Sequence, residues 1–152
     1  MEIREFDKKF QDLFTQLTEI AFEFVKRNKK EIDEIYIFSS MESGNFFYNV
    51  FYKINGKLVK LHKINTVSAQ QYDLSSERTF ALLKLGTEDL EAIAKLFKED
   101  KREVPTILKM VYSPKTGKFI NDISYELHYS NENQKTVTDV FNEWFVEMGG
   151  KI

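Results

Sequence analysis

The sequence predicts an α+β domain in which an antiparallel sheet of about five strands is covered on one face by helices. Apolar residues recur at helical spacing in three segments. In five other segments they alternate or form short β-rich runs, and turn sequences separate these segments. A chain of 152 residues that is 42% apolar, with 14 Phe and 7 Tyr, can bury one core. Residues 1–152 are therefore expected to form a single domain.

The first helix is expected to run from Ile3 to about Asn28. Its apolar stripe recurs at steps of three and four residues and consists of Ile3, Phe6, Phe10, Leu13, Leu17, Ile20 and Phe24. A basic run follows in residues 26–30, where cations oppose the carbonyl end of the helix dipole. We interpret this run as a helix terminator rather than a phosphate site.

A meander of three strands is expected next. Residues 35–38 are too short a run for a helix here and are rich in β-formers, and residues 45–54 form a second such segment. Asn55–Gly56 can adopt the positive φ angles of a tight hairpin turn before a third strand in residues 57–65. Residues 65–74 have no clear period, which indicates a loop.

A second helix is expected to begin at Ser76. Gly86 interrupts the helical pattern, and Thr87 could restart it as an N-cap, so the pattern allows one kinked helix or two. The charged run in residues 98–103 ends the helical pattern. Pro105 then favours an extended backbone for the segment around it.

The last part of the chain predicts a hairpin followed by a helix. Leu108, Met110 and Tyr112 share one face of the first strand, and Pro114 and Gly117 suit the turn. The return strand alternates Ile123, Tyr125, Leu127 and Tyr129 with Asp122, Ser124, Glu126 and His128. An apolar stripe in residues 137–148 forms the final helix, closed by Gly149 and Gly150. The predicted order of elements is α-β-β-β-α-β-β-α.

The composition argues against several partners and compartments. The net charge is −2, and Lys and Glu are interleaved along the chain, so a nucleic-acid partner is not expected. The absence of Cys excludes disulfides and zinc–thiolate sites and is typical of a cytoplasmic protein. The first ten residues carry scattered charges, which do not fit a signal peptide, and no membrane-spanning segment is expected.

The sequence shows no motif for catalysis or cofactor binding. His62 and His128 lie on separate predicted strands without a third ligand at chelating spacing, although Glu126 shares a face with His128. The serines lack a nucleophile elbow, and the six glycines form no phosphate-cradling loop. We therefore expect no enzyme, metal or cofactor, while a hydrolase that uses paired carboxylates remains an alternative.

Several segments carry a family resemblance. "IDEIYIFSS", "LEAIAKLFKEDKREVPT" and "GKFINDISYE", together with the order of elements from Phe6 to Glu126, resemble the YezG-like immunity proteins. These are cytosolic antitoxins of bacterial polymorphic toxins that are carried by type VII secretion. The resemblance implies a protein that binds and neutralises a cognate protein toxin, typically a nuclease, and that contributes no catalytic residues.

Physical occlusion is the mechanism expected for such a protein, because an acidic patch can compete for the basic groove of a nuclease. The candidate contact residues are Glu88, Asp89, Glu91, Glu99 and Asp100 on the second helix, and Asp122, Glu126 and His128 on the last strand. Solvation alone is their alternative role. The alternative function is binding of a small ligand in a pocket lined by Phe and Tyr between sheet and helices. The toxin's identity and the oligomeric state stay open.

Overall fold

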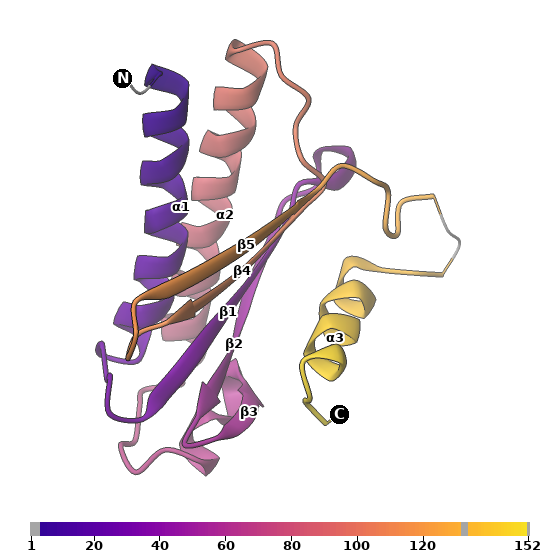
Figure 1. Ribbon diagram of the computed structural model, residues 1–152. Coiled ribbons are helices and arrows are strands. Elements are labelled where there is room, and N and C mark those ends of the chain that lie inside the picture. Colours follow the sequence, from indigo (N-terminus) through magenta and orange to yellow (C-terminus); the bar gives the residue numbers. More distant parts are fainter. Residues whose placement is uncertain (1–3, 132–133, 152) are drawn as a thin grey trace.

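The computed structural model describes residues 4–131 and 134–151, which form a five-stranded antiparallel sheet and three α-helices (Figure 1). The elements in chain order are α1 (Glu5–Phe24), β1 (Ile32–Ser40), the 3₁₀ turn Glu42–Gly44, β2 (Phe47–Ile54), β3 (Lys57–Lys60), the 3₁₀ helix Leu61–Thr66, α2 (Ser76–Glu99), β4 (Ile107–Ser113), β5 (Lys118–Ser124) and α3 (Val137–Glu147). The predicted α+β class, the order of elements and the five antiparallel strands are confirmed.

The sheet has the strand order β3-β2-β1-β4-β5, so β1 is central and β3 and β5 are its edges. Both predicted hairpin turns form. Asn55 and Gly56 have φ angles of 51° and 81°, the left-handed values that connect β2 to β3. Gly117, with φ of 77°, donates its N–H to the carbonyl of Ser113 at 2.8 Å and closes the turn between β4 and β5. Local turn chemistry therefore sets the register of both hairpins.

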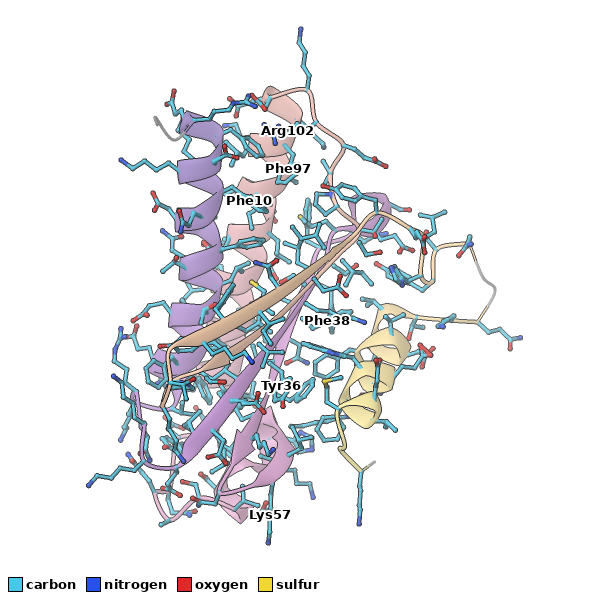
Figure 2. The ribbon with its side chains drawn as sticks, viewed as in Figure 1. Phe10, Tyr36, Phe38, Lys57, Phe97 and Arg102 are labelled. Carbon is cyan, nitrogen blue, oxygen red and sulfur yellow. The ribbon has the colours of Figure 1, made fainter. Side chains whose placement is uncertain are left out.

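The larger core lies between the sheet and the paired helices α1 and α2. Ile35 and Ile37 of β1 are fully buried in this core, and Phe10 and Phe97 meet between the two helices, with ring centroids 5.0 Å apart (Figure 2). Two tyrosines of β2 fix α1 to the sheet. The buried hydroxyls of Tyr48 and Tyr52 donate to carbonyls of α1, those of Leu17 and Ala21, at 2.8 and 2.7 Å.

A second, aromatic core lies on the opposite face of the sheet, under α3. Tyr36 and Phe38 point toward α3 (Figure 2) and pack with Phe51 against the buried face of that helix. The rings of Phe51 and Trp144 meet edge to face at 5.1 Å. The expected cover by helices on one face alone is therefore incorrect. Because successive side chains of β1 alternate between the two faces and nearly all are buried, both faces need a cover.

Helix α2 is continuous through Gly86, which settles the alternative left open by the sequence pattern. Ser75 is its N-cap and accepts the N–H of Arg78 at 3.3 Å. Thr87 caps nothing, because its hydroxyl donates to the carbonyl of Leu83 at 2.8 Å. A β carbon at Gly86 would lie 2.1 Å from the ring of Tyr48. Gly86 therefore serves a close approach of α2 to the sheet rather than a break in the helix.

Some predicted boundaries are wrong. The predicted helix start, Ile3, lies outside the described residues, and α1 ends at Phe24 rather than near Asn28. Lys26 and Arg27 have φ angles of 54° and 53°, so the basic run lies in a turn beyond the helix. Strand β3 ends at Lys60, and His62 lies in the following 3₁₀ helix rather than on a strand.

The last strand is also shorter than predicted. Strand β5 ends at Ser124, so Glu126 and His128 do not share the face of a strand. Backbone groups beyond Ser124 bind elsewhere: the buried carboxylate of Glu42 accepts the N–H groups of His128, Tyr129 and Ser130 at 2.7, 3.1 and 2.6 Å. Three successive N–H groups that converge on one side chain cannot also form a strand ladder, in which they alternate in direction.

Candidate functional site

The eight predicted contact residues do not lie on one face of the sheet. Glu88, Asp89, Glu91, Glu99 and Asp100 belong to α2 and the residue after it, on the face of the larger core. Asp122 lies on the other face, because it pairs with Lys109, which in turn pairs with Phe38 under α3. The structure therefore does not combine all eight residues into one acidic surface.

The α2 group is only weakly acidic. Glu88, Glu91 and Glu99 are exposed on the outer side of the helix. Lys84 and Lys95 are exposed on the same side, four residues from these acids. Because acidic and basic side chains alternate at this spacing, their electrostatic potentials largely cancel at a distance from the helix. The outer side of α2 thus lacks the concentrated negative charge that the occlusion mechanism needs.

Asp100 is occupied by contacts within the chain. Its carboxylate lies 2.5 Å from the Arg102 guanidinium and 3.6 Å from that of Arg4. The Arg102 guanidinium also lies over the Phe6 ring, 3.8 Å from its centroid. Asp100 therefore ties the end of α2 to the start of α1, and it is a poor candidate for contact with a partner.

Asp89 of α2 is half-buried. Burial raises the pKa of its carboxyl to about 6, and the neighbouring Glu88 adds to the shift. This location contradicts the expectation that Asp89 belongs to a fully solvated helix face. Its charge costs stability where the carboxyl is ionised.

Replacing Asp89 with Asn is expected to stabilise the protein at about pH 7 by on the order of 1 kcal/mol, an estimate reduced for partial exposure. The folded-state pKa is raised from 3.8, so stability is greatest below that pH and falls as pH rises to about 6. The stability gained by Asp89→Asn should therefore vanish below pH 3.8, where the carboxyl of the parent is protonated in both the folded and the unfolded chain. Urea unfolding at several pH values checks this, with the exposed Glu91→Gln as control. Equal stability of Asp89→Asn and the parent at neutral pH would contradict it.

His128 and Glu126 belong to the turns that follow β5. The Nε2 atom of His128 lies 2.8 Å from the hydroxyl of Ser124, and that hydroxyl also accepts the N–H of Glu126 at 3.4 Å. The Glu126 carbonyl accepts the hydroxyl of Thr106 at 2.7 Å, whereas its side chain is exposed. Among the described residues, no group of three His, Asp or Glu side chains is placed to hold a metal ion.

No helix within the described ranges is long and apolar enough to cross a membrane.

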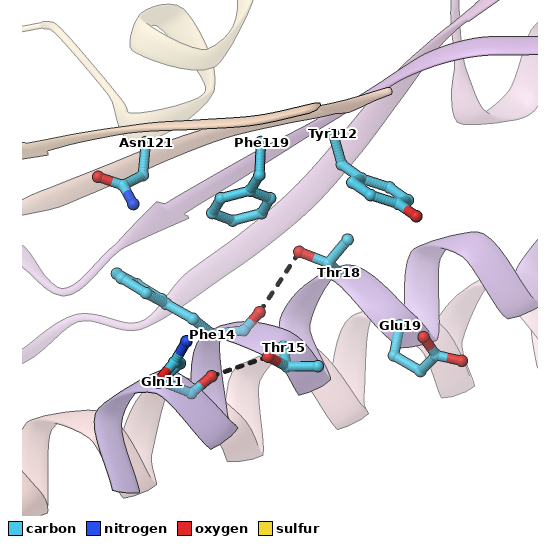
Figure 3. Close-up of a pocket in the computed structure, with 8 residues that line it drawn as sticks. All are labelled: Gln11, Phe14, Thr15, Thr18, Glu19, Tyr112, Phe119 and Asn121. Carbon is cyan, nitrogen blue, oxygen red and sulfur yellow. Dashed lines mark hydrogen bonds between the residues drawn. The ribbon is translucent and has the colours of Figure 1, made fainter. Parts of the chain in front are cut away.

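A pocket of about 410 Å³ opens between α1 and the β4–β5 hairpin (Figure 3). The side chains that line it are those of Gln11, Phe14, Thr15, Thr18, Glu19, Tyr112, Phe119 and Asn121. Figure 3 shows the rings of Tyr112 and Phe119 facing α1 from the strands. The hydroxyls of Thr15 and Thr18 donate to carbonyls of their own helix at 2.9 and 3.3 Å. The volume lies within the range of small-molecule pockets.

Exposed apolar side chains concentrate on and just after β5. Phe119, Ile120, Tyr125 and Leu127 are exposed by 39, 52, 45 and 53%. They are four of the eight exposed large apolar residues in the part of the chain that the structure describes. The sequence pattern placed Tyr125 and Leu127 on the same strand face as Tyr129, but only Tyr129 is buried. Large exposed apolar side chains gathered in one short segment are a feature of protein contact sites.

One sequence signal points to this surface. Phe119 and Ile120 are adjacent, so on a strand their side chains lie on opposite faces. A single layer of helices cannot cover both faces of the strand. In the structure α1 stands over the Phe119 side, whereas α3 packs over β1 and β2 and leaves Ile120 exposed.

Comparison of the sequence with models of known protein families and with curated proteins finds no match.

Proposed function

We propose that this chain binds another protein through residues 119–127 and performs no catalysis. The observation that carries the proposal is the cluster of four exposed apolar side chains, two of them aromatic, within nine consecutive residues. Aromatic side chains that become buried on association contribute much of the free energy of binding. In keeping with the resemblance to YezG-like immunity proteins, the partner would be a toxin that the protein neutralises in the bacterial cytoplasm.

The mechanism proposed is occlusion of the toxin's functional groove. Asp122 and Glu126 are exposed within the same segment as the apolar cluster. Carboxylates around apolar contacts suit the basic groove of a nuclease, since they steer association while the apolar side chains provide contact area. The acids of α2 lie on the other side of the sheet and would take no part in this contact.

Co-expression with the product of the adjacent gene, taken as the candidate toxin, tests the proposal. We expect the parent chain to protect cells and Leu127→Asp to lose protection, because a buried, unpaired carboxylate opposes association. Leu85→Asp is the matched control, since Leu85 on α2 is exposed by 49% and Leu127 by 53%. Killing that is equal with and without the parent chain would refute the antitoxin function. Full protection by Leu127→Asp would refute the proposed surface.

Binding of a small ligand is the second candidate, and the pocket between α1 and β5 is the observation that favours it. Three rings, those of Phe14, Tyr112 and Phe119, and the amides of Gln11 and Asn121 line this pocket. Aromatic walls with a few polar groups are typical of ligand sites. A thermal-shift screen of metabolites would support this function if one compound raised Tm saturably and Thr15→Trp, which fills the pocket, abolished the shift.

A further inference from the structure

We propose that β5 pairs antiparallel with β5 of a second copy of this chain, so that the two sheets join into one continuous sheet. The pairing is centred on Ile120. This inference concerns the chain alone and does not depend on a toxin. The dimer would use Phe119 and Ile120, so a second copy and a toxin would compete for these two residues. It rests on three properties of β5: an open edge, a sequence that complements itself, and exposed apolar side chains at the centre of the strand.

The outer edge of β5 is available for pairing. In the part of the chain that the structure describes, β4 is the only strand paired with β5. The seven residue pairs between these two strands, from Ile107 with Ser124 to Ser113 with Lys118, run without a register shift. Native edges are commonly protected by bulges, by Pro, by charged side chains or by covering segments. Strand β5 has neither Pro nor bulge, and its two charged side chains, Lys118 and Asp122, have opposite signs, so its outer N–H and C=O groups can accept a strand with complementary charges.

The sequence of β5 complements itself in one register. Two strands related by a two-fold axis and centred on Ile120 place Lys118 of each copy opposite Asp122 of the other. Ile120 then faces its own counterpart, and Phe119 faces Asn121. The pairing thus forms two opposite-charge pairs around an apolar contact. It also covers Ile120, which is 52% exposed in the single chain.

Neighbouring registers lack this complementarity. Centring on Asn121 places Lys118 opposite Ser124 and Ile120 opposite Asp122. Centring on Phe119 places Lys118 opposite Ile120. Registers centred between two residues would oppose side chains from different faces, which a two-fold antiparallel pair does not allow. The register centred on Ile120 is therefore the favoured one.

The charges within one chain support the same arrangement. Asp122 pairs across β4–β5 with Lys109, and Lys118 pairs with the uncharged Ser113. In the joined sheet, each Asp122 would lie between Lys109 of its own chain and Lys118 of the other. A carboxylate flanked by two cations gains from both, whereas in the single chain Lys118 has no acidic residue opposite it on β4.

Sedimentation velocity of the purified full-length chain at several concentrations tests the inference. We expect a reversible dimer. Lys118→Asp and Asp122→Lys should each weaken it by about tenfold or more, because each creates two like-charge pairs. The double variant Lys118→Asp/Asp122→Lys should restore dimerisation, because it restores opposite charges across the interface. Lys84→Asp/Glu88→Lys, a matched exchange on α2, should leave the dimer unchanged.

Three outcomes would overturn the inference: a monomer at every concentration, single variants that dimerise like the parent, or a double variant that stays monomeric while folded. Asp122→Lys also places a cation beside Lys109, so circular dichroism must show that it folds. Should it unfold, Lys118→Asp alone decides, since it faces only Ser113 within the chain. No toxin is present in these measurements, so their failure and failure of the proposed function are separate results.

Discussion

Replacing Glu42 with Ala is expected to lower the free energy of unfolding by about 2–4 kcal/mol. Glu42 is fully buried, and its carboxylate accepts the N–H groups of His128, Tyr129 and Ser130. Removing the carboxylate leaves these donors without their acceptor, and the Tyr129 N–H is shielded from water. Urea unfolding measures the loss. We expect the near-UV signal of the α3 aromatic core to weaken as well, because Tyr129 belongs to that core.

Two variants make the Glu42 result specific. Glu126→Ala removes an exposed carboxylate from the same segment and should change stability by less than about 0.5 kcal/mol. Glu42→Gln keeps the shape but has one carbonyl oxygen in place of two acceptors, so its loss should be intermediate. Equal stability of Glu42→Ala and Glu126→Ala would show that the buried carboxylate does not hold the segment.

The Glu42 carboxylate should also make the folded protein less stable in acid. Burial of Glu42 by itself raises the pKa, but the hydrogen bonds from Ser130, His128 and Tyr129 outweigh it, so the pKa falls below its ordinary 4.5. A depressed folded-state pKa gives stability that is fully present above 4.5 and is lost as pH falls through the folded-state value. Glu42→Gln should therefore flatten the acid side of the stability profile.

Replacing Gly86 with Val is expected to destabilise the protein by about 3 kcal/mol or more. A β carbon at this position would lie 2.1 Å from the Tyr48 ring. The ring cannot move aside easily, because it is buried and its hydroxyl donates to the carbonyl of Leu17. Helix α2 would have to separate from β2. Ala92→Val, at an exposed position of the same helix, should cost only about 0.5 kcal/mol, from helix propensity.

A double-mutant cycle tests the cause of the Gly86 effect. Gly86→Ala adds only the β carbon and should still destabilise the parent, although Ala favours a helix more than Gly does. In a Tyr48→Leu background the ring is gone, so Gly86→Ala should cost less there. Thermal unfolding of the four proteins measures the coupling. A cost of Gly86→Ala that is the same in both backgrounds would show that the Tyr48 ring is not the obstacle.

The elements themselves could be predicted because their signals are local. The stripe of α1 repeats every three or four residues, and the run Ile35–Phe38 contains only β-formers. Asn55–Gly56 carries the positive φ angles of its turn in two adjacent residues. Such patterns need no knowledge of distant segments, so the order of elements and the five strands followed from them.

The candidate site could be predicted only in part, because exposure depends on what covers each face. Asp122 and Glu126 are exposed as expected, but Asp89 is half-buried and Asp100 is ion-paired with two arginines. Tyr125 follows the alternation of a strand that ends one residue earlier, and it is exposed. An alternating pattern places side chains on two faces but does not say which face a helix will cover.

The sequence alone determined the kind of each element, since backbone preferences, periodicity and turn residues act within a few neighbouring residues. Tertiary structure alone decided that α3 covers the second face of the sheet and that Gly86 meets Tyr48. It also decided that Glu42 binds backbone groups 86 to 88 residues further along the chain. The reason is physical: burial and hydrogen-bond partners belong to pairs of segments, and the free energy of such a pair appears only when folding brings its members together.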